Sequence, residues 1–247
     1  METKTEFITS NDEHWYPSTT KSGVWYPSVT TILSIWPKGI GFQRYLANQE
    51  SWDASQETLK KAGDRGTKVH KATEVLEEGG SLHRDSFTLE EWQMLMGFVA
   101  WHTANKPKLV FMEKSVVSDD SETGGTIDRV YLIGSRTVLL DIKTSSSIHE
   151  QYWAQTGKYA EIFMKTHDIP LDATAILRLA PRRKDLYEYE EHTDFFSDAQ
   201  MFDHIHSIWK YLNPKAKPKV IELPVVLTLP RYAPKPKGRR KKAQTQA

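Results

Sequence analysis

The chain has 247 residues, of which 38% are hydrophobic and 26% charged, with eight Trp and ten Tyr. This composition is ordinary for a globular protein and excludes an intrinsically disordered chain. The sequence contains no Cys, which excludes disulfide bonds, thiolate zinc sites and iron–sulfur clusters, so any bound metal must have oxygen or imidazole ligands. Met1 to Trp15 holds four acidic residues and no apolar run. Because no stretch reaches membrane-spanning length either, we expect a cytoplasmic protein without a signal peptide or a membrane segment.

The net charge of +1 is unevenly distributed along the chain. Residues 214–247 contain ten Lys or Arg and one Glu, a local charge of +9, which leaves −8 for residues 1–213. Nucleic acid is the first partner that such a basic tail suggests, although most Lys/Arg runs are simply solvated. We expect one catalytic domain with a core over residues 61–213, capped by an aromatic and helical region over residues 1–60.

The first 50 residues predict a hairpin and two short helices. Trp15-Tyr16-Pro17-Ser18 is nearly repeated by Trp25-Tyr26-Pro27-Ser28, which predicts an aromatic hairpin that turns at Ser22-Gly23. Ser28 then serves as the N-cap of a helix from about residue 29 to 36, and a second helix covers much of residues 42–48.

A longer helical segment follows over residues 55–78. Its apolar and small residues fit helical spacing only in part, because Gly63 and Gly66 interrupt them. We expect a break near Gly66 and a firm helix after it, ending at Gly79-Gly80. Residues 89–105 carry apolar side chains at helical intervals and predict a further helix.

The centre of the chain changes to β-branched and aliphatic residues, punctuated by Gly124-Gly125 and Gly134-Ser135. This order of elements predicts a mixed α/β (α+β) domain with a central β-sheet flanked by helices. The expected elements are strands over 108–118, 126–133 and 137–143, a helix over 149–166, a hairpin that pairs 173–179 with 186–193, and a helix over 197–211.

Three side chains in the predicted strands carry the chemistry. Asp141 and Lys143 project from the same strand face because side chains alternate; in isolation, they would form a surface salt bridge. Asp128 lies thirteen residues before Asp141, and antiparallel pairing can bring the two carboxylates together. Neighbouring carboxylates repel unless they are protonated or bridged by a divalent cation. A carboxylate-bound cation beside a Lys provides what phosphodiester hydrolysis needs.

Four motifs in chain order resemble those of the PD-(D/E)XK nucleases, and within them the RecB-like, phage-type exonuclease branch. Each motif is weak alone, and together they are fairly specific. They are Gly66-Thr-Lys-Val-His70, Gly125-Thr-Ile-Asp128, Asp141-Ile-Lys143 and Gln155-Thr-Gly-Lys-Tyr159. The chain departs from some relatives in lacking iron–sulfur cysteines and helicase motifs, and its Asp-x-Lys motif has Asp where Glu is commoner.

The resemblance implies a restriction-endonuclease-like core with a site for Mg²⁺ or Mn²⁺. Asp128, Asp141, the backbone carbonyl of Ile142 and the imidazole of His70 would bind the cation, and Lys143 would stabilise the transition state or orient the attacking water. The implied activity is metal-dependent hydrolysis of DNA, by an exonuclease that acts on DNA ends or single strands in replication, recombination or repair.

Several residues allow a second interpretation. A lone helical His such as His70 is more often structural or exposed than a ligand. Glu113 is either a further metal ligand or a solvent-facing strand residue. Gln155 and Tyr159 share a helix face and either contact DNA or line a helix–sheet seam. Arg178 either contacts phosphates or favours solubility.

Other function classes stay open on the sequence alone. The same fold could carry a structure-specific endonuclease. A non-catalytic DNA-binding module is a different class, which the complete Asp128, Asp141 and Lys143 set argues against. A metal-free interaction protein, with the tail as its functional part, is a third. The sequence does not determine whether the protein has a partner protein in replication or recombination. It also does not determine the oligomeric state.

Overall fold

The computed structural model describes residues 8–10, 13–179, 184 and 186–218. The basic tail from residue 219 onward and most of the turn at 181–185 therefore lie outside the described residues. The elements, in chain order, are β1 (Ile8–Ser10), β2 (Glu13–Pro17), β3 (Trp25–Pro27), α1 (Val29–Leu33), α2 (Ile40–Ala47), α3 (Trp52–Glu77), η1 (Arg84–Ser86), α4 (Leu89–Asn105), β4 (Lys108–Ser118), β5 (Thr123–Ile133), β6 (Arg136–Lys143), α5 (Glu150–His167), β7 (Ala173–Leu179), β8 (Tyr187–His192) and α6 (Phe195–Leu212).

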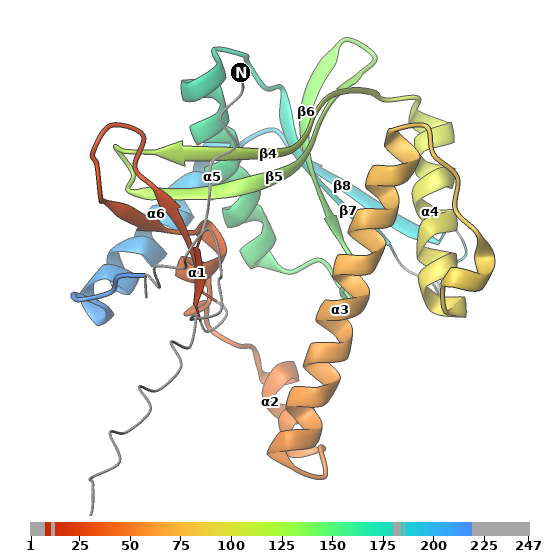
Figure 1. Ribbon diagram of the computed structural model, residues 1–247, viewed down its shortest axis with the longest axis horizontal. Coiled ribbons are helices and arrows are strands. Elements are labelled where there is room, and N and C mark those ends of the chain that lie inside the picture. Colours follow the sequence, from red (N-terminus) through yellow and green to blue (C-terminus); the bar gives the residue numbers. More distant parts are fainter. Residues whose placement is uncertain (1–7, 11–12, 180–183, 185, 219–247) are drawn as a thin grey trace, which may run out of the picture.

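The core is a five-stranded mixed sheet with the order β4-β5-β6-β7-β8. Strands β6 and β7 are parallel, with α5 as the connection between them, and the other pairs are antiparallel. Helices α3 and α4 pack on one face and α5 and α6 on the other (Figure 1). The predicted mixed α/β class is therefore confirmed. Among the described residues, no helix combines the length and apolarity needed to cross a membrane.

Strand β6 shows how the alternation of side chains positions the site. Val138, Leu140 and Ile142 are fully buried on the face covered by α3 and α4, whereas Leu139 belongs to the core beneath α5. Asp141 and Lys143 continue the row of Leu139, so their side chains meet α5. A run of apolar residues thus ends in two charged groups at the end of a central strand.

The N-terminal aromatic hairpin is present and forms a separate three-stranded sheet. Tyr16 pairs with Tyr26 between β2 and β3, and β1 adds a third strand that the sequence did not predict. Ser28 caps α1 as expected, since its hydroxyl accepts a hydrogen bond from the Thr31 N–H. A bridge between Ser28 and Gly124 joins this region to β5.

The predicted break near Gly66 is wrong, because α3 is continuous over 26 residues. A Gly inside a helix costs only about 1 kcal/mol relative to Ala, and contacts with α4 offset this cost: Arg65 pairs with Glu90 and Lys68 with Glu91, both at 2.8 Å. A Cβ on Gly66 would lie 3.2 Å from Thr144 Oγ1. Gly66 therefore permits close approach of α3 to the end of β6.

The predicted turn at Gly124-Gly125 is also displaced, since both glycines lie within β5. A Cβ on Gly124 would lie 2.9 Å from Tyr16 Cγ, and one on Gly125 would lie 2.2 Å from Tyr159 Cε1. The two glycines thus make room for aromatic rings that pack on the strand. Glycine is therefore needed here for packing within the strand, and the chain reverses earlier, in the turn at residues 119–122.

Candidate active site

Asp128 and Asp141 lie on neighbouring antiparallel strands. The register pairs Arg129 with Leu140, which places Asp128 beside Asp141. Asp128 Oδ2 accepts a hydrogen bond of 2.8 Å from the Ile142 N–H and lies 3.5 Å from His70 Nδ1 on α3. The carboxylate of Asp128 is therefore held between β6 and α3.

Asp141, Lys143 and Gln155 form a second polar group on the α5 face. Lys143 Nζ lies 2.6 Å from Asp141 Oδ2 and donates to Gln155 Oε1 at 3.2 Å, while Gln155 Nε2 donates to Asp141 Oδ1 at 3.1 Å. The ammonium also lies 4.6 Å from the centre of the Tyr152 ring. Gln155 thus holds both members of the Asp141–Lys143 pair in place.

Burial and mutual charge set the protonation of this pair. Burial raises the pKa of the Asp141 carboxyl to about 6, with the Lys143 ammonium opposing the rise and the Asp128 carboxylate adding to it. Burial lowers the pKa of the Lys143 ammonium, but the carboxylates of Asp141 and Asp128 outweigh it and the net pKa is raised. Lys143 therefore carries a positive charge at neutral pH.

The ligand atoms of His70, Glu113 and Asp128 lie within 4.8 Å of one another. One imidazole and two carboxylates so placed form a donor set for a divalent cation. Asp141 is not part of this group; Lys143 and Gln155 engage its carboxylate instead. Ile142 lines the adjoining cleft, and its N–H, rather than its carbonyl, makes the observed contact with Asp128.

Glu113 occupies an unusual backbone conformation at this site. Its φ of 48° is in the left-handed region, which is uncommon for residues other than Gly. Its neighbours Met112 and Lys114 pair with Arg129 and Ile127, so it lies across from Asp128. Burial raises the pKa of Glu113 to about 7; the Asp128 carboxylate adds to the rise, and the Arg129 guanidinium opposes it.

Arg129 is a site residue that the sequence analysis missed. Its side chain is fully buried and donates to Glu113 Oε1 at 3.1 Å, to the Asp128 carbonyl at 2.7 Å and to Thr73 Oγ1 at 3.0 Å. It thus links β4, β5 and α3 around the donor set. The sequence signal for this role was the position of Arg129 directly after the candidate ligand Asp128. Its partners Glu113 and Thr73 could not be recognised because they are distant in sequence.

Tyr159 is a residue of α5, and its ring packs between this helix and β5, next to the site. Its ring occupies the space over Gly125, and its phenol is buried. Burial raises the pKa of the Tyr159 hydroxyl well above its usual value, and the charges of Asp141 and Asp128 raise it further. Tyr159 therefore stays protonated and packs into the seam, which was one of the two interpretations of the sequence.

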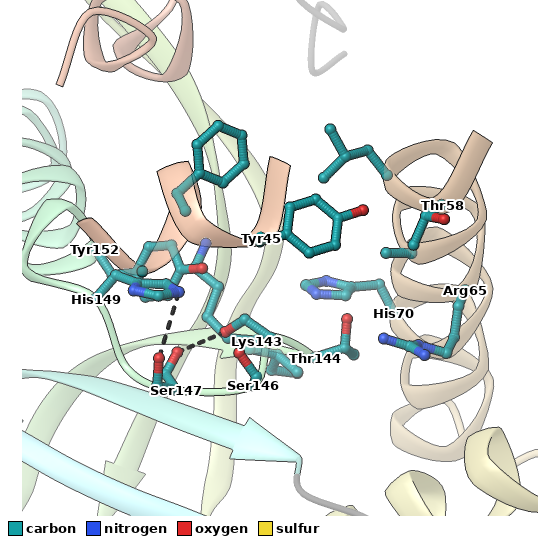
Figure 2. Close-up of a pocket in the computed structure, with 16 residues that line it drawn as sticks. Tyr45, Thr58, Arg65, His70, Lys143, Thr144, Ser146, Ser147, His149 and Tyr152 are labelled. Carbon is teal, nitrogen blue, oxygen red and sulfur yellow. Dashed lines mark hydrogen bonds between the residues drawn. The ribbon is translucent and has the colours of Figure 1, made fainter. Parts of the chain in front are cut away.

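A cleft of 760 Å³ opens beside these groups. Its lining includes Lys143, His70 and Ile142, together with Tyr45 on α2 and Arg65 on α3. Figure 2 shows the labelled side chains of α2, α3 and the β6–α5 loop converging on this space. The further lining residues include the hydroxyl-bearing run Thr144, Ser145, Ser146 and Ser147.

Arg178, for which a phosphate contact or a role in solubility was expected, is buried and paired with Glu188. It is buried on β7, its Nε and Nη2 both lie 2.6 Å from Glu188 Oε2, and its Nη1 donates to the Ser145 carbonyl at 3.4 Å. Arg178 therefore supports the β6–α5 loop and is not among the residues that line the 760 Å³ cleft. The basic turn before β8 lies largely outside the described residues.

No protein-family model matches this chain, and no curated protein matches it either. Among solved structures, that of SSO0001 aligns with 47% of this chain at 14% sequence identity, with a TM-score of 0.31. The alignment covers 56% of that chain, so it spans little more than half of its length.

Proposed function

We propose that this protein is a metal-dependent DNA nuclease of the PD-(D/E)XK type. The observation that carries the proposal is the position of Lys143 Nζ, 2.6 Å from Asp141 Oδ2, while Asp128 on the next strand adjoins His70 and Glu113. A cationic group for the phosphate thus lies close to a donor set for a cation, and Lys143 and His70 both line the cleft.

The residues present fit Mg²⁺ or Mn²⁺. The donors are carboxylate oxygens and an imidazole, which these cations accept, and no thiolate is available in the chain. The pKa of Glu113 is raised partly by the Asp128 carboxylate, a repulsion that a cation between them would relieve. When bound there, the cation supplies Lewis acidity to the phosphate and lowers the pKa of water.

The protein's own groups have distinct tasks in this proposal. His70, Glu113 and Asp128 would hold the cation, and Asp141 on the neighbouring strand would be a further carboxylate ligand. The Lys143 ammonium stabilises negative charge that grows on the phosphate in the transition state. Gln155 hydrogen-bonds to both Asp141 and Lys143 and so holds the two side chains next to each other.

The proposed substrate is DNA, as the motif resemblance implies, and the proposed reaction is exonucleolytic cleavage at ends or of single strands. A channel that accommodates polyanionic DNA needs local positive charge, because residues 1–213 carry a net charge of −8. Lys143 and Arg65 supply that charge in the cleft. An endonuclease on the same scaffold is the alternative, and a cytoplasmic location stays a prediction.

The test is incubation of the purified protein with linear and circular DNA, single- and double-stranded, in Mg²⁺, Mn²⁺ or EDTA. We expect cleavage with either cation, none in EDTA, and resistance of covalently closed circles. Asp128→Asn should abolish cleavage, and Asp64→Asn, an exposed residue of α3, should not. Full activity in EDTA, or in Asp128→Asn, would show that the proposed site is not catalytic.

A further inference from the structure

Two polar groups on opposite walls of the cleft have no partner among the described residues. Tyr45 Oη on α2 and Arg65 Nε on α3 are both shielded from water and make no hydrogen bond. Both residues line the cleft that holds Lys143 and His70. Figure 2 shows Arg65 pointing from α3 toward Thr144, with the His70 imidazole drawn between Thr144 and the Tyr45 ring. Buried polar groups are usually hydrogen-bonded, so these two unpaired donors are candidates to hydrogen-bond a ligand.

The guanidinium of Arg65 is fixed in place on one side and available on the other. Its Nη1 donates to Glu90 Oε2 at 2.8 Å. The next residue, Gly66, brings α3 to within contact of Thr144 at the end of β6. Because Arg presents its N–H groups as a planar fork, the side that Glu90 does not occupy is preorganised for a bidentate acceptor.

The charge of the cleft identifies the kind of acceptor. Among the described residues that line it, none is Asp or Glu, although the body of the protein is acidic overall. The lining provides two fixed cations, Arg65 and Lys143, and four successive hydroxyl-bearing residues after Lys143. Arg65 and Lys143 pair with Glu90 and Asp141, but neither carboxylate lines the cleft, so the donors that line it favour an anion. The aromatic rings of Phe42 and Tyr152 in the same lining favour an anion that is joined to bases.

We propose that Tyr45 and Arg65 form a second phosphate site, which binds a phosphodiester of the nucleic acid strand other than the one at Lys143. This inference rests on the proposed function for the identity of the strand. Arg65 holds the phosphate through charge and paired N–H groups, and the Tyr45 hydroxyl donates one hydrogen bond from the opposite wall. Since no residue of α2 is buried, α2 can adjust to close this contact.

The experiment measures binding alone, in EDTA, so that it does not depend on catalysis. Fluorescence anisotropy gives the Kd of the full-length protein for a short labelled oligothymidylate and for a set in which one phosphodiester at a time is a neutral methylphosphonate. Arg65→Ala should weaken binding by about 10- to 100-fold, as loss of a charged hydrogen-bonding group does, and Tyr45→Phe by about threefold to tenfold.

Two substitutions serve as matched controls. Lys61→Ala removes an exposed cation one turn away on α3, and Tyr211→Phe removes the hydroxyl of a Tyr that is 85% exposed on α6. Both should bind within about twofold of the wild-type protein. Arg65→Lys keeps the charge and loses the planar fork, so its affinity should fall between those of the wild type and Arg65→Ala.

The methylphosphonate series decides the question. The wild-type protein should be weakened at one linkage in particular, and Arg65→Ala should lose that position-specific penalty. Identical profiles for the two proteins, with folding confirmed by circular dichroism, would overturn the site; so would the absence of any DNA binding. If Arg65→Ala does not fold, the same comparison is made with Arg65→Lys and Tyr45→Phe.

The outcome for this site is separate from that for the nuclease. A wild-type protein that shows the expected profile but cleaves no DNA with any cation would support the phosphate site and contradict the proposed function. A wild-type protein that cleaves DNA but has the same methylphosphonate profile as Arg65→Ala would support the nuclease function and contradict the second phosphate site.

Discussion

The ring of Tyr159 occupies the space where any side chain on Gly125 would have to lie. A Cβ on Gly125 would be 2.2 Å from Tyr159 Cε1 and 2.7 Å from its hydroxyl. Gly125 lies three residues before Asp128 on β5, and Tyr159 lies one helical turn after Gln155 on α5. Two of the motifs are therefore in direct contact, and this contact sets the distance between α5 and β5 beneath the site.

Gly125→Ala should consequently damage both folding and activity. The methyl group must displace Tyr159 or β5, and overpacking of this kind costs about 1–3 kcal/mol. Urea unfolding measures the loss, and a nuclease assay in Mg²⁺ measures the effect on Asp128. Gly63→Ala is the matched control, because its Cβ meets nothing within 4 Å and a helical Ala should stabilise by up to about 1 kcal/mol. Equal stability of the two variants would contradict the packing argument.

Lys143→Ala should lower the rate of cleavage with little effect on DNA affinity. If the ammonium stabilises the transition state, its loss should reduce kcat by about two to three orders of magnitude, as for one preorganised donor. Single-turnover rates at saturating DNA separate this effect from binding. Lys165→Ala, an exposed residue on the same side of the sheet, should retain the wild-type rate. A Lys143→Ala variant with normal kcat and weak binding would make Lys143 a DNA contact instead.

Arg129→Met should weaken both the fold and the binding of cations. The variant removes the hydrogen bonds that Arg129 donates to the Asp128 carbonyl and Thr73, whereas Glu113, 39% exposed, is screened by solvent, so the loss of stability should be about 1–3 kcal/mol. Glu113 is also released from the position that places it near Asp128 and His70. Calorimetric titration with Mn²⁺ measures this second effect.

Arg129→Lys separates the two effects because it keeps the charge but can make fewer of the three hydrogen bonds. We expect it to fold and to bind Mn²⁺ more weakly than the wild-type protein. If it binds Mn²⁺ with unchanged affinity, Arg129 contributes to stability alone and does not organise the donor set.

The sequence predicted the parts of the site that follow from local rules. Alternation along β6 placed Asp141 and Lys143 on one face, and the turn at Gly134 set the register that brings Asp128 beside Asp141. Arg129 was missed because Thr73 and Glu113 become its neighbours only when α3 and β4 pack on β5. Such contacts depend on tertiary structure, which spacing along one strand does not specify.

Two other expectations failed for identifiable physical reasons. Gly66 indicates close packing against Thr144, whereas helical propensity alone favoured a break. Arg178 was expected either at a phosphate or as an exposed residue that favours solubility, yet it is buried, and the antiparallel register pairs it with Glu188, with which it forms an ion pair. The predicted hairpin did not specify the register that places Glu188 across from Arg178.

His206 should make the protein less stable in mild acid. It is a buried residue of α6, 5% exposed, whose Nε2 has no hydrogen-bond partner among the described residues. Burial lowers the pKa of His206 to about 4, and the nearby Lys210 ammonium lowers it further while the Asp203 carboxylate opposes this. In the unfolded chain the pKa of a His is about 6.5, so the unfolded state takes up a proton at a higher pH than the folded state does.

The sign of the pH dependence follows from this difference. Stability that depends on a neutral His206 is fully present above about pH 6.5 and is lost as the pH falls toward 4. Other groups also titrate in this range, so the measurement compares urea unfolding of the wild-type protein with that of His206→Phe at neutral pH and near pH 5. His206→Phe should gain about 1–2 kcal/mol on the wild type between these conditions, as linkage with this lowered pKa requires. The exposed His204 of the same helix provides the control, since His204→Phe should show no such gain. A constant difference between the wild type and His206→Phe across pH would mean that His206 has a normal pKa in the folded protein.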